Sequence, residues 1–193
     1  MACKELYEMT LEELWELFPI VLRDHNPAYA DWYEEQRAEI VGYLSAHLFR
    51  ISHIGSSAVP GLLAKPTVDM LLELNPEADV DDVRQTLTDH GWGLMREVHE
   101  PHFQMSFNRG YTPDGFAEKV YHLHVRYAGD WGEPYFRDYL RLHPETANAY
   151  AMLKQQLLKQ YEHDRDRYTD EKHDFVSSVT KAARLEFLGR YMP

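Results

Sequence analysis

The spacing of apolar residues changes twice along the chain, from a helical period to an alternating one and back. The helical period predicts two N-terminal helices, over residues 10–18, where Thr10 and Glu13 form a capping-box pattern, and over residues 28–48. Short β-rich or alternating runs predict strands at residues 19–23, 51–54, 67–74, 92–97, 102–108 and 119–127. Residues 79–90 predict a helix that ends at Gly91, and residues 109–115 a hairpin turn.

From Glu133 onward the helical period returns almost to the end of the chain. It predicts helices over residues 134–141, 145–162 and 169–188, with a break at His143-Pro144. No repeat or convincing linker divides the sequence. The pattern therefore predicts one α+β domain: an N-terminal helix within about residues 1–18, a core of four to five strands over about 19–130, and a C-terminal helical subdomain over about 131–193.

Composition narrows the class of protein. With 193 residues, of which 44% are hydrophobic, the chain is long and apolar enough to bury a core. A net charge of −12 argues against a surface that binds duplex nucleic acid, because neutralising phosphates requires a basic face. Cys3 is the single cysteine and is expected in a frayed N-terminus, and Lys4, Glu5 and Glu8 interrupt any apolar leader. No apolar run is long enough for a membrane span, so we expect a cytoplasmic protein.

The stretch from His53 to Asp69 is the first candidate for chemistry. In Gly55-Ser56-Ser57, small residues form a bend whose backbone N–H groups can face an anion. Lys65 and then Asp69 follow, the latter early in a predicted strand, which suggests a site for a metal and a phosphate group. A structural interpretation competes equally: Ser56 caps a helix, Lys65 is solvated, and Asp69 is a hydrogen-bonded strand residue.

His122 and His124 share one face of the strand predicted at 119–127, because side chains alternate along a strand. Two imidazoles placed in this way are a common source of nitrogen ligands, and Asp69 on a neighbouring strand would complete a three-ligand metal site. The alternative is that both histidines are half-buried and hydrogen-bonded to the backbone. The run from Glu97 to His102 also has a ligand-like composition, but its predicted loop favours solvated side chains.

Basic residues in the C-terminal helices form a third candidate group. Arg137 and Arg141 lie four residues apart, as do Tyr150 and Lys154, and Lys172 follows in the last predicted helix. In an acidic chain these cations would line an anion pocket that closes over Gly55 and Ser56. The alternative is that they are surface residues paired with neighbouring carboxylates.

Several of these segments together resemble the GrpB family, which is placed in the nucleotidyltransferase superfamily with DNA polymerase β-like and kanamycin-type enzymes. The most specific is His53-Ile-Gly-Ser-Ser-Ala-Val-Pro-Gly-Leu-Leu-Ala-Lys-Pro-Thr-Val-Asp69. The resemblance spans about residues 20–185. Further similar segments are Asn26–Tyr29, Trp32–Glu35, His122-Leu-His124-Val, Phe136–Arg141, Tyr150 with Lys154, and Tyr168 with Lys172.

The resemblance implies a nucleotidyltransferase-like mixed sheet flanked by helices. It also implies transfer of a nucleotidyl group from a nucleoside triphosphate to an acceptor, by in-line attack on the α-phosphorus with pyrophosphate leaving and Mg²⁺ or Mn²⁺ neutralising charge. Carried over to this sequence, Asp69 is the catalytic residue and first metal ligand. The residues implied to contact nucleotide phosphates are Gly55, Ser56, Ser57, Lys65, Arg137, Arg141, Lys154 and Lys172.

The sequence departs from that superfamily at one position. Active members carry a second carboxylate two residues after the first, where this chain has Leu71. Glu73 lies one repeat further, about 7 Å along the strand, and cannot simply replace it. His122 and His124 would convert the site to one suited to Zn²⁺ or another transition metal. Two alternatives to transfer therefore stay open: a degraded enzyme that only binds a nucleotide or another phosphorylated small molecule, and a metal-dependent hydrolase with a His/Asp site.

Overall fold

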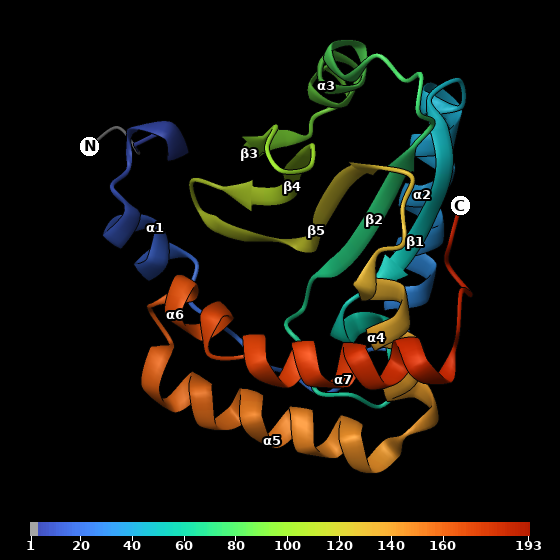
Figure 1. Ribbon diagram of the computed structural model, residues 1–193. Helices are drawn as coiled ribbons and strands as arrows, with labels where there is room; N and C mark the ends of the chain where they lie inside the picture. Colours follow the sequence, from blue (N-terminus) through green and yellow to red (C-terminus); the bar gives the residue numbers. More distant parts are fainter. Residues whose placement is uncertain (1–3) are drawn as a thin grey trace.

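A five-stranded mixed sheet lies at the centre of the protein (Figure 1). The computed structural model describes residues 4–193, and Cys3 lies outside the described residues. The strands are β1 (Leu48–Ile54), β2 (Val68–Leu74), β3 (Gly93–Val98), β4 (Gln104–Thr112) and β5 (Gly115–Tyr127), in the order β1-β2-β5-β4-β3. The β2 and β5 strands are parallel, and the other neighbours are antiparallel. The predicted α+β class and mixed sheet are confirmed.

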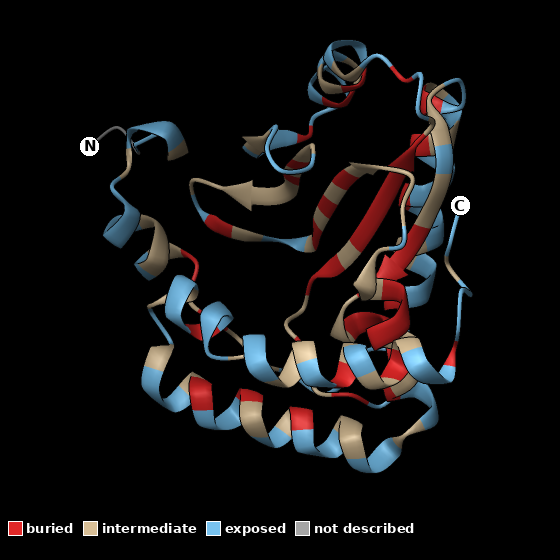
Figure 2. Cartoon of the chain, in the orientation of Figure 1, coloured by how far each residue is buried: buried red, intermediate tan, exposed pale blue. Residues whose placement is uncertain are grey.

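Apolar residues on alternate positions of the sheet form the main core against two helices. The α2 helix (Tyr29–Leu44) and the α3 helix (Val80–Asp89) cover this face. Figure 2 shows β2 buried over most of its length. Met70, Leu72 and Leu123 belong to this core, as the predicted alternation requires. Because neighbouring side chains point to opposite faces, Asp69, Leu71 and His122 lie on the other side of the sheet.

Four helices gather beneath that second face in Figure 1: α4 (Gly132–Leu142), α5 (Pro144–Tyr161), α6 (Arg165–Asp170) and α7 (His173–Glu186). A second apolar cluster joins α4, α5 and α7 to the loop after β1, through Phe136, Tyr150, Val179 and Leu62. The helical layer therefore closes over the polar face of β2 and β5. Within residues 4–193 no helix is both long and apolar enough to cross a membrane.

The N-terminal elements pack against the tip of the β4–β5 hairpin. They are the short 3₁₀ helix η1 (Leu6–Glu8) and α1 (Leu11–Leu17), which begins at the predicted capping box of Thr10 and Glu13. Phe18, directly after α1, stacks at an angle on Tyr111 and Phe116, with ring centroids 4.7 and 5.0 Å away. This contact fixes the tip of the hairpin.

Three predictions for the N-terminal part and the sheet are wrong. Residues 19–23 form no strand beyond a single bridge from Arg23 to Ala64, because the amide of Ile20 instead donates to Glu162. The helix predicted over 28–48 ends at Leu44, and Leu48 already pairs in β1. The turn predicted at 109–115 is reduced to residues 113–114, because β4 and β5 keep pairing to Thr112 and Gly115.

The helix predicted over residues 169–188 is in fact two helices. Asp164 caps α6 by accepting a hydrogen bond from the amide of Arg167, so helical structure begins earlier than predicted. It then breaks at residues 171–172, and α7 begins at His173. The break places Arg165 of α6 and Lys172, which directly precedes α7, in the lining of one cavity.

Candidate functional site

A cavity of about 550 Å³ lies between the polar face of the sheet and the helical layer. Its size suits a small-molecule ligand. Asp69 on β2 and His122 and His124 on β5 contribute from the sheet, and Gly55 from the turn after β1. The helices supply Glu133, Phe136, Tyr150, Arg165, Asp166, Tyr168 and Lys172. The structure thus brings together Gly55, Lys65, Asp69, both histidines and Lys172, as the sequence predicted.

Gly55 makes the close approach of the turn to Asp69 possible. Its φ of +72° and ψ of −171° lie in a region that is essentially restricted to glycine. A Cβ at this position would lie 2.5 Å from Oδ2 of Asp69. The next residues form the 3₁₀ helix η2 (Ser56–Ala58), which is not capped by the Ser56 side chain.

Asp69 is the first member of a hydrogen-bonded chain. The paired register of β2 and β5 sets Asp69 opposite His122, and Nδ1 of His122 lies 3.1 Å from Oδ1 of Asp69. The other ring nitrogen of His122, Nε2, lies 2.8 Å from the hydroxyl of Tyr111, and a guanidinium nitrogen of Arg165 donates to that hydroxyl at 3.1 Å. Sequence reasoning missed Tyr111 and Arg165, because neither residue lies in a motif and α6 was not predicted.

The charge of Asp69 follows from these partners. Burial alone would raise the pKa of its carboxyl group, but the hydrogen bond from His122 and the charges of His122, Lys65 and His124 outweigh burial and lower it to about 2. For His124 burial prevails and lowers the pKa of the imidazole. At neutral pH the cavity therefore contains an ionised Asp69 and a neutral His124.

The predicted metal ligands do not fit a three-ligand ion site. Both ring nitrogens of His122 are engaged, by Asp69 and Tyr111. His124 is paired in register with Leu71, about 7 Å further along the strand than Asp69. Within residues 4–193 no group of three His, Cys, Asp or Glu side chains is arranged to hold a metal ion.

Lys65 and Lys172 are the prominent cations of the cavity. Their ammonium groups flank the ring of Tyr168, 5.9 and 4.3 Å from its centroid. Among the described residues neither has a carboxylate oxygen within 4 Å or a side-chain hydrogen bond. Burial, together with the neighbouring cations, lowers the pKa of both amines, that of Lys172 to about 7, although Asp69 acts in the opposite direction.

Lys154 lies behind these groups and is only 3% exposed. Its ammonium group donates to Oγ of Ser56 at 2.9 Å and to the carbonyl of Leu63, so it fastens the Gly-Ser turn to α5. Burial lowers its pKa to about 7, and Lys65 adds to the effect. Ser57 is buried and its Oγ lies 3.1 Å from Nε2 of His53. The two serine hydroxyls are thus held by the protein, and it is the backbone of the turn that reaches the cavity.

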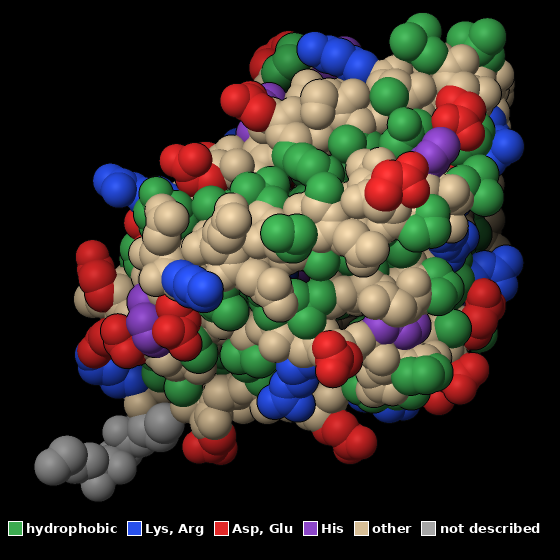
Figure 3. Space-filling view, turned by 90° about the horizontal axis from the view of Figure 1, so that it is seen from below, with side chains coloured by type: hydrophobic (Ala, Val, Ile, Leu, Met, Phe, Trp, Pro, Cys, Tyr) green, Lys and Arg blue, Asp and Glu red, His purple; other side chains and the backbone are tan. Residues whose placement is uncertain are grey.

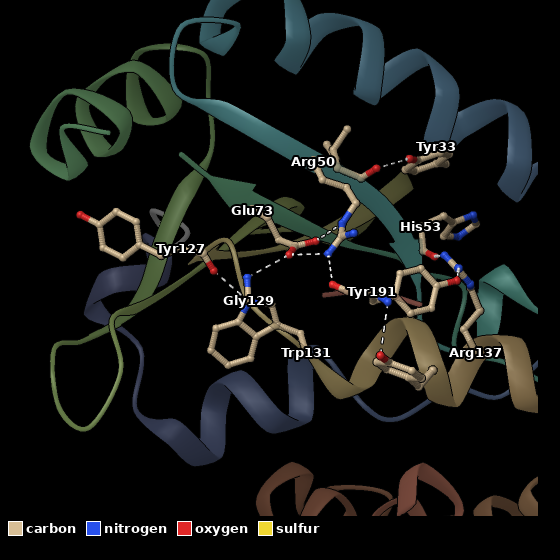
Figure 4. A network of polar contacts seen from close by, with 11 residues as sticks. Tyr33, Arg50, His53, Glu73, Tyr127, Gly129, Trp131, Arg137 and Tyr191 are labelled. Carbon is tan, nitrogen blue, oxygen red and sulfur yellow. Dashed lines mark hydrogen bonds and ion pairs between the residues drawn. The ribbon is translucent and has the colours of Figure 1, made fainter. Parts of the chain in front are cut away.

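Arg137 and Arg141 do not join the other predicted residues at the cavity. Arg137 donates to the carbonyl of His53 and to the hydroxyl of Tyr191, each at 2.8 Å (Figure 4). Arg141 donates to the carbonyl of Ala58 at 2.9 Å. Both arginines hold the backbone around the Gly-Ser turn from outside, so the geometry favours a structural role over phosphate contact.

Glu73 and the Glu97–His102 run lie apart from the cavity. Glu73 is fully buried and accepts two hydrogen bonds from Arg50, at 2.6 and 2.8 Å (Figure 4). It is therefore unable to replace the carboxylate missing at Leu71, as predicted. Glu97 pairs with Arg84 and with the exposed His99, which agrees with the surface interpretation of that run.

The fold and the candidate site together indicate the class of protein to which the chain belongs. A mixed five-stranded sheet flanked by helices, with a Gly-Ser turn facing an aspartate on the next strand, is consistent with the nucleotidyltransferase superfamily. Residues 19–182 match the family model described as GrpB protein, so the chain belongs to the GrpB family.

Known proteins support this assignment. A UPF0157 protein of Pseudomonas aeruginosa is 35% identical over 157 residues, covering 80% of this chain and 63% of the relative. The glutamate-rich protein GrpB of Alkalihalophilus pseudofirmus is 27% identical, covering 83% of this chain and 93% of the relative. The crystal structure of GrpB from Enterococcus faecalis matches with a TM-score of 0.75 and 25% identity, covering 86% of this chain and 99% of that one.

Length differs among the relatives. The chain spans 48% of a UPF0157 protein of Bacillus subtilis, with 27% identity over 172 residues, and 63% of the Pseudomonas protein.

Proposed function

We propose that this protein binds a phosphorylated small molecule, of which a nucleotide is the leading example, in the cavity beneath the sheet. The observation that carries the proposal is the pair of ammonium groups of Lys65 and Lys172, which line one cavity beside the Gly55 turn and have no carboxylate partner among residues 4–193. Both lysines are half-buried, and removing an ammonium group even partly from water is unfavourable unless an anion compensates for it. An anionic ligand would supply the missing partner.

Two residues of the same lining also carry polar atoms that the described part of the protein leaves without a partner. Nε of Arg165 and the hydroxyl of Tyr168 are buried and have no hydrogen-bond partner among residues 4–193. Buried polar atoms in native proteins are nearly always satisfied, so such orphans require an explanation. Phosphate oxygens accept hydrogen bonds readily from arginine and lysine.

The distribution of charge argues for a small ligand rather than duplex nucleic acid. The chain carries a net charge of −12. On the face shown in Figure 3, acidic and basic side chains are interspersed and form no basic surface. Lys65 and Lys172 lie in the lining of a cavity, where a small molecule fits and a duplex does not.

Nucleotidyl transfer is the second candidate, and one observation favours it. Asp69, with its low pKa, lies directly against the Gly55 turn, as the resemblance to nucleotidyltransferases implies. Its test is release of pyrophosphate from nucleoside triphosphates in the presence of a mixture of small-molecule acceptors, with Asp69→Asn as control. A metal-dependent hydrolase is not proposed, because the His/Asp donor set does not fit. The cytoplasmic location expected from the sequence remains a prediction.

The binding proposal is tested by calorimetric titration of the purified protein with ATP, ADP, pyrophosphate and inorganic phosphate, in EDTA and with added Mg²⁺ or Mn²⁺. Lys172→Met is expected to weaken binding by about 10-fold or more, since a hydrogen bond to a charged group contributes roughly 1.5–3 kcal/mol. The matched control is Lys181→Met, which removes an exposed lysine from α7, the helix that Lys172 directly precedes, and is expected to leave binding unchanged. Absence of binding by the wild type, or equal losses in both variants, would refute the proposal.

A further inference from the structure

The two oxygens of the Asp69 carboxylate have different surroundings. Oδ1 accepts the hydrogen bond from His122 at 3.1 Å. Oδ2 lies against Gly55, and among the described residues no group donates a hydrogen bond to it. Asp69 lines the cavity, and its side chain retains 25% of its exposure. The cavity therefore offers one acceptor oxygen of a fixed carboxylate with no protein partner.

The chain behind Oδ1 holds this arrangement in place. Because Oδ1 of Asp69 can only accept, Nδ1 of His122 carries the proton and Nε2 accepts from the hydroxyl of Tyr111. The Tyr111 ring also stacks on the imidazole, at an angle of 20°. Arg165 then donates to the Tyr111 hydroxyl. Residues of β2, β5, β4 and α6 thus position one carboxylate so that its free oxygen faces the turn.

The other carboxylates of the lining are placed differently. Glu133 is paired with Arg126 at 2.7 Å, and Asp166 is exposed at the rim. Oδ2 of Asp69 therefore lies in the same cavity as Lys65 and Lys172 and accepts no hydrogen bond from the described residues. A fully ionised phosphate has only acceptor oxygens and cannot satisfy it.

A ligand that satisfies both halves of the cavity must bring an anion for the lysines and a hydrogen-bond donor for Asp69. We infer that the ligand carries a hydroxyl group close to its phosphate, as in a phosphorylated polyol or sugar or the ribose phosphate of a nucleotide, and that Asp69 Oδ2 accepts the hydrogen bond from that hydroxyl. This inference rests on the proposed function and narrows its ligand class. His122 and Tyr111 act as positioning residues for the contact.

The test compares two phosphate esters of equal chain length by NMR titration, which measures millimolar affinities. Glycerol 3-phosphate carries hydroxyl groups next to the phosphate ester, and n-propyl phosphate carries none. Wild-type protein is expected to bind glycerol 3-phosphate about 10-fold more tightly or better, which is the discrimination that one hydrogen bond to a charged group provides. Asp69→Ala is expected to remove this preference.

Asp166→Ala is the matched control, because it removes a carboxylate from the same cavity without touching the chain at Asp69. It is expected to keep the preference. Equal affinity of the wild type for both esters, or a preference that survives in Asp69→Ala, overturns the inference and leaves anion binding intact. Binding of neither ester by a protein that binds ATP or inorganic phosphate overturns the inference alone, and binding of none of these compounds overturns the proposed function as well. The wild-type comparison decides the matter even where Asp69→Ala does not fold.

Discussion

Gly55 is the position where backbone conformation and the candidate site meet, and replacing it with alanine tests both. The backbone conformation there is one that residues other than glycine adopt only under strain. The new methyl group would also lie 2.5 Å from Oδ2 and 3.1 Å from Cβ of Asp69. Because His122 fixes that carboxylate, it cannot rotate away without losing a hydrogen bond.

Two contributions set the size of the effect. The backbone strain contributes about 1–3 kcal/mol, and forcing a methyl group into a filled space contributes roughly another 1–3 kcal/mol. Gly55→Ala should therefore lower the free energy of unfolding by about 2–6 kcal/mol. Gly61 provides the control, because its φ is +76° but an added Cβ would meet no atom within 4 Å. Gly61→Ala should be limited to strain, about 1–2 kcal/mol.

The assay is urea denaturation of both variants, followed by circular dichroism. The double variant Gly55→Ala with Asp69→Ala should lose less stability than the sum of the two single changes, because removing Oδ2 and Cγ relieves part of the collision. Equal destabilisation at Gly55 and Gly61, or strict additivity in the double variant, would show that the Asp69 carboxylate does not lie where the structure places it.

Three other perturbations probe the remaining parts of the argument. In urea denaturation, Arg50→Met should destabilise the fold by about 3–5 kcal/mol, because it leaves Glu73 fully buried without its partner. Adding Glu73→Leu should recover most of this loss, and a double variant no more stable than Arg50→Met would contradict the reasoning. Sulfate, whose charge is constant between pH 6 and 9, should bind less tightly as pH rises, because burial lowers the pKa of Lys172 to about 7 and its positive charge is lost above that value. Calorimetry should show that the affinity of Lys172→Arg, which stays charged, declines less steeply with pH. The same decline in this variant as in the wild type would exclude Lys172 as a contact. Ring ¹⁵N shifts should show that the neutral His122 ring carries its proton on Nδ1. Tyr111→Phe should remove the hydrogen bond at Nε2 and lower the stability by about 1 kcal/mol. A neutral ring with its proton on Nε2 in the wild type would rule out the hydrogen bonds that link Asp69, His122 and Tyr111.

The part of the site that lies on the sheet could be predicted from the sequence. Alternation along a strand is a local property, so the pattern of residues 67–74 and 119–127 was enough to set Asp69 and His122 on one polar face. The candidate metal site also assumed that the two strands are neighbours, and β2 and β5 do pair. What local pattern could not supply was the choice of partner for each imidazole nitrogen. Tyr111 takes one of them, and the turn predicted at that position hid its place in β4.

The helical part was harder to predict, because spacing gives the face of a helix but not its neighbour. Arg137 and Arg141 share a face with the predicted i, i+4 relation, yet that face points to the backbone carbonyls of His53 and Ala58. Lys154 and Lys172 have no more distinctive sequence context, and tertiary packing alone brings them beside the Gly-Ser turn. Arg165 entered the site only because Asp164 caps α6 and starts that helix earlier than the apolar pattern suggested.

Strand β2 carries two carboxylates on the same face, and their contrast is the strongest argument for a ligand. Glu73 is fully buried, and Arg50 and the amide of Gly129 satisfy it within the protein. Asp69 has only Oδ1 satisfied, and it lies in a cavity with two lysines that have no anionic partner among residues 4–193. The protein thus pairs the buried carboxylate of Glu73, which has a structural role, with its own Arg50. Departures from full pairing are expected where a site is shaped for a partner, and the partner that we propose here is an anion that also donates a hydrogen bond.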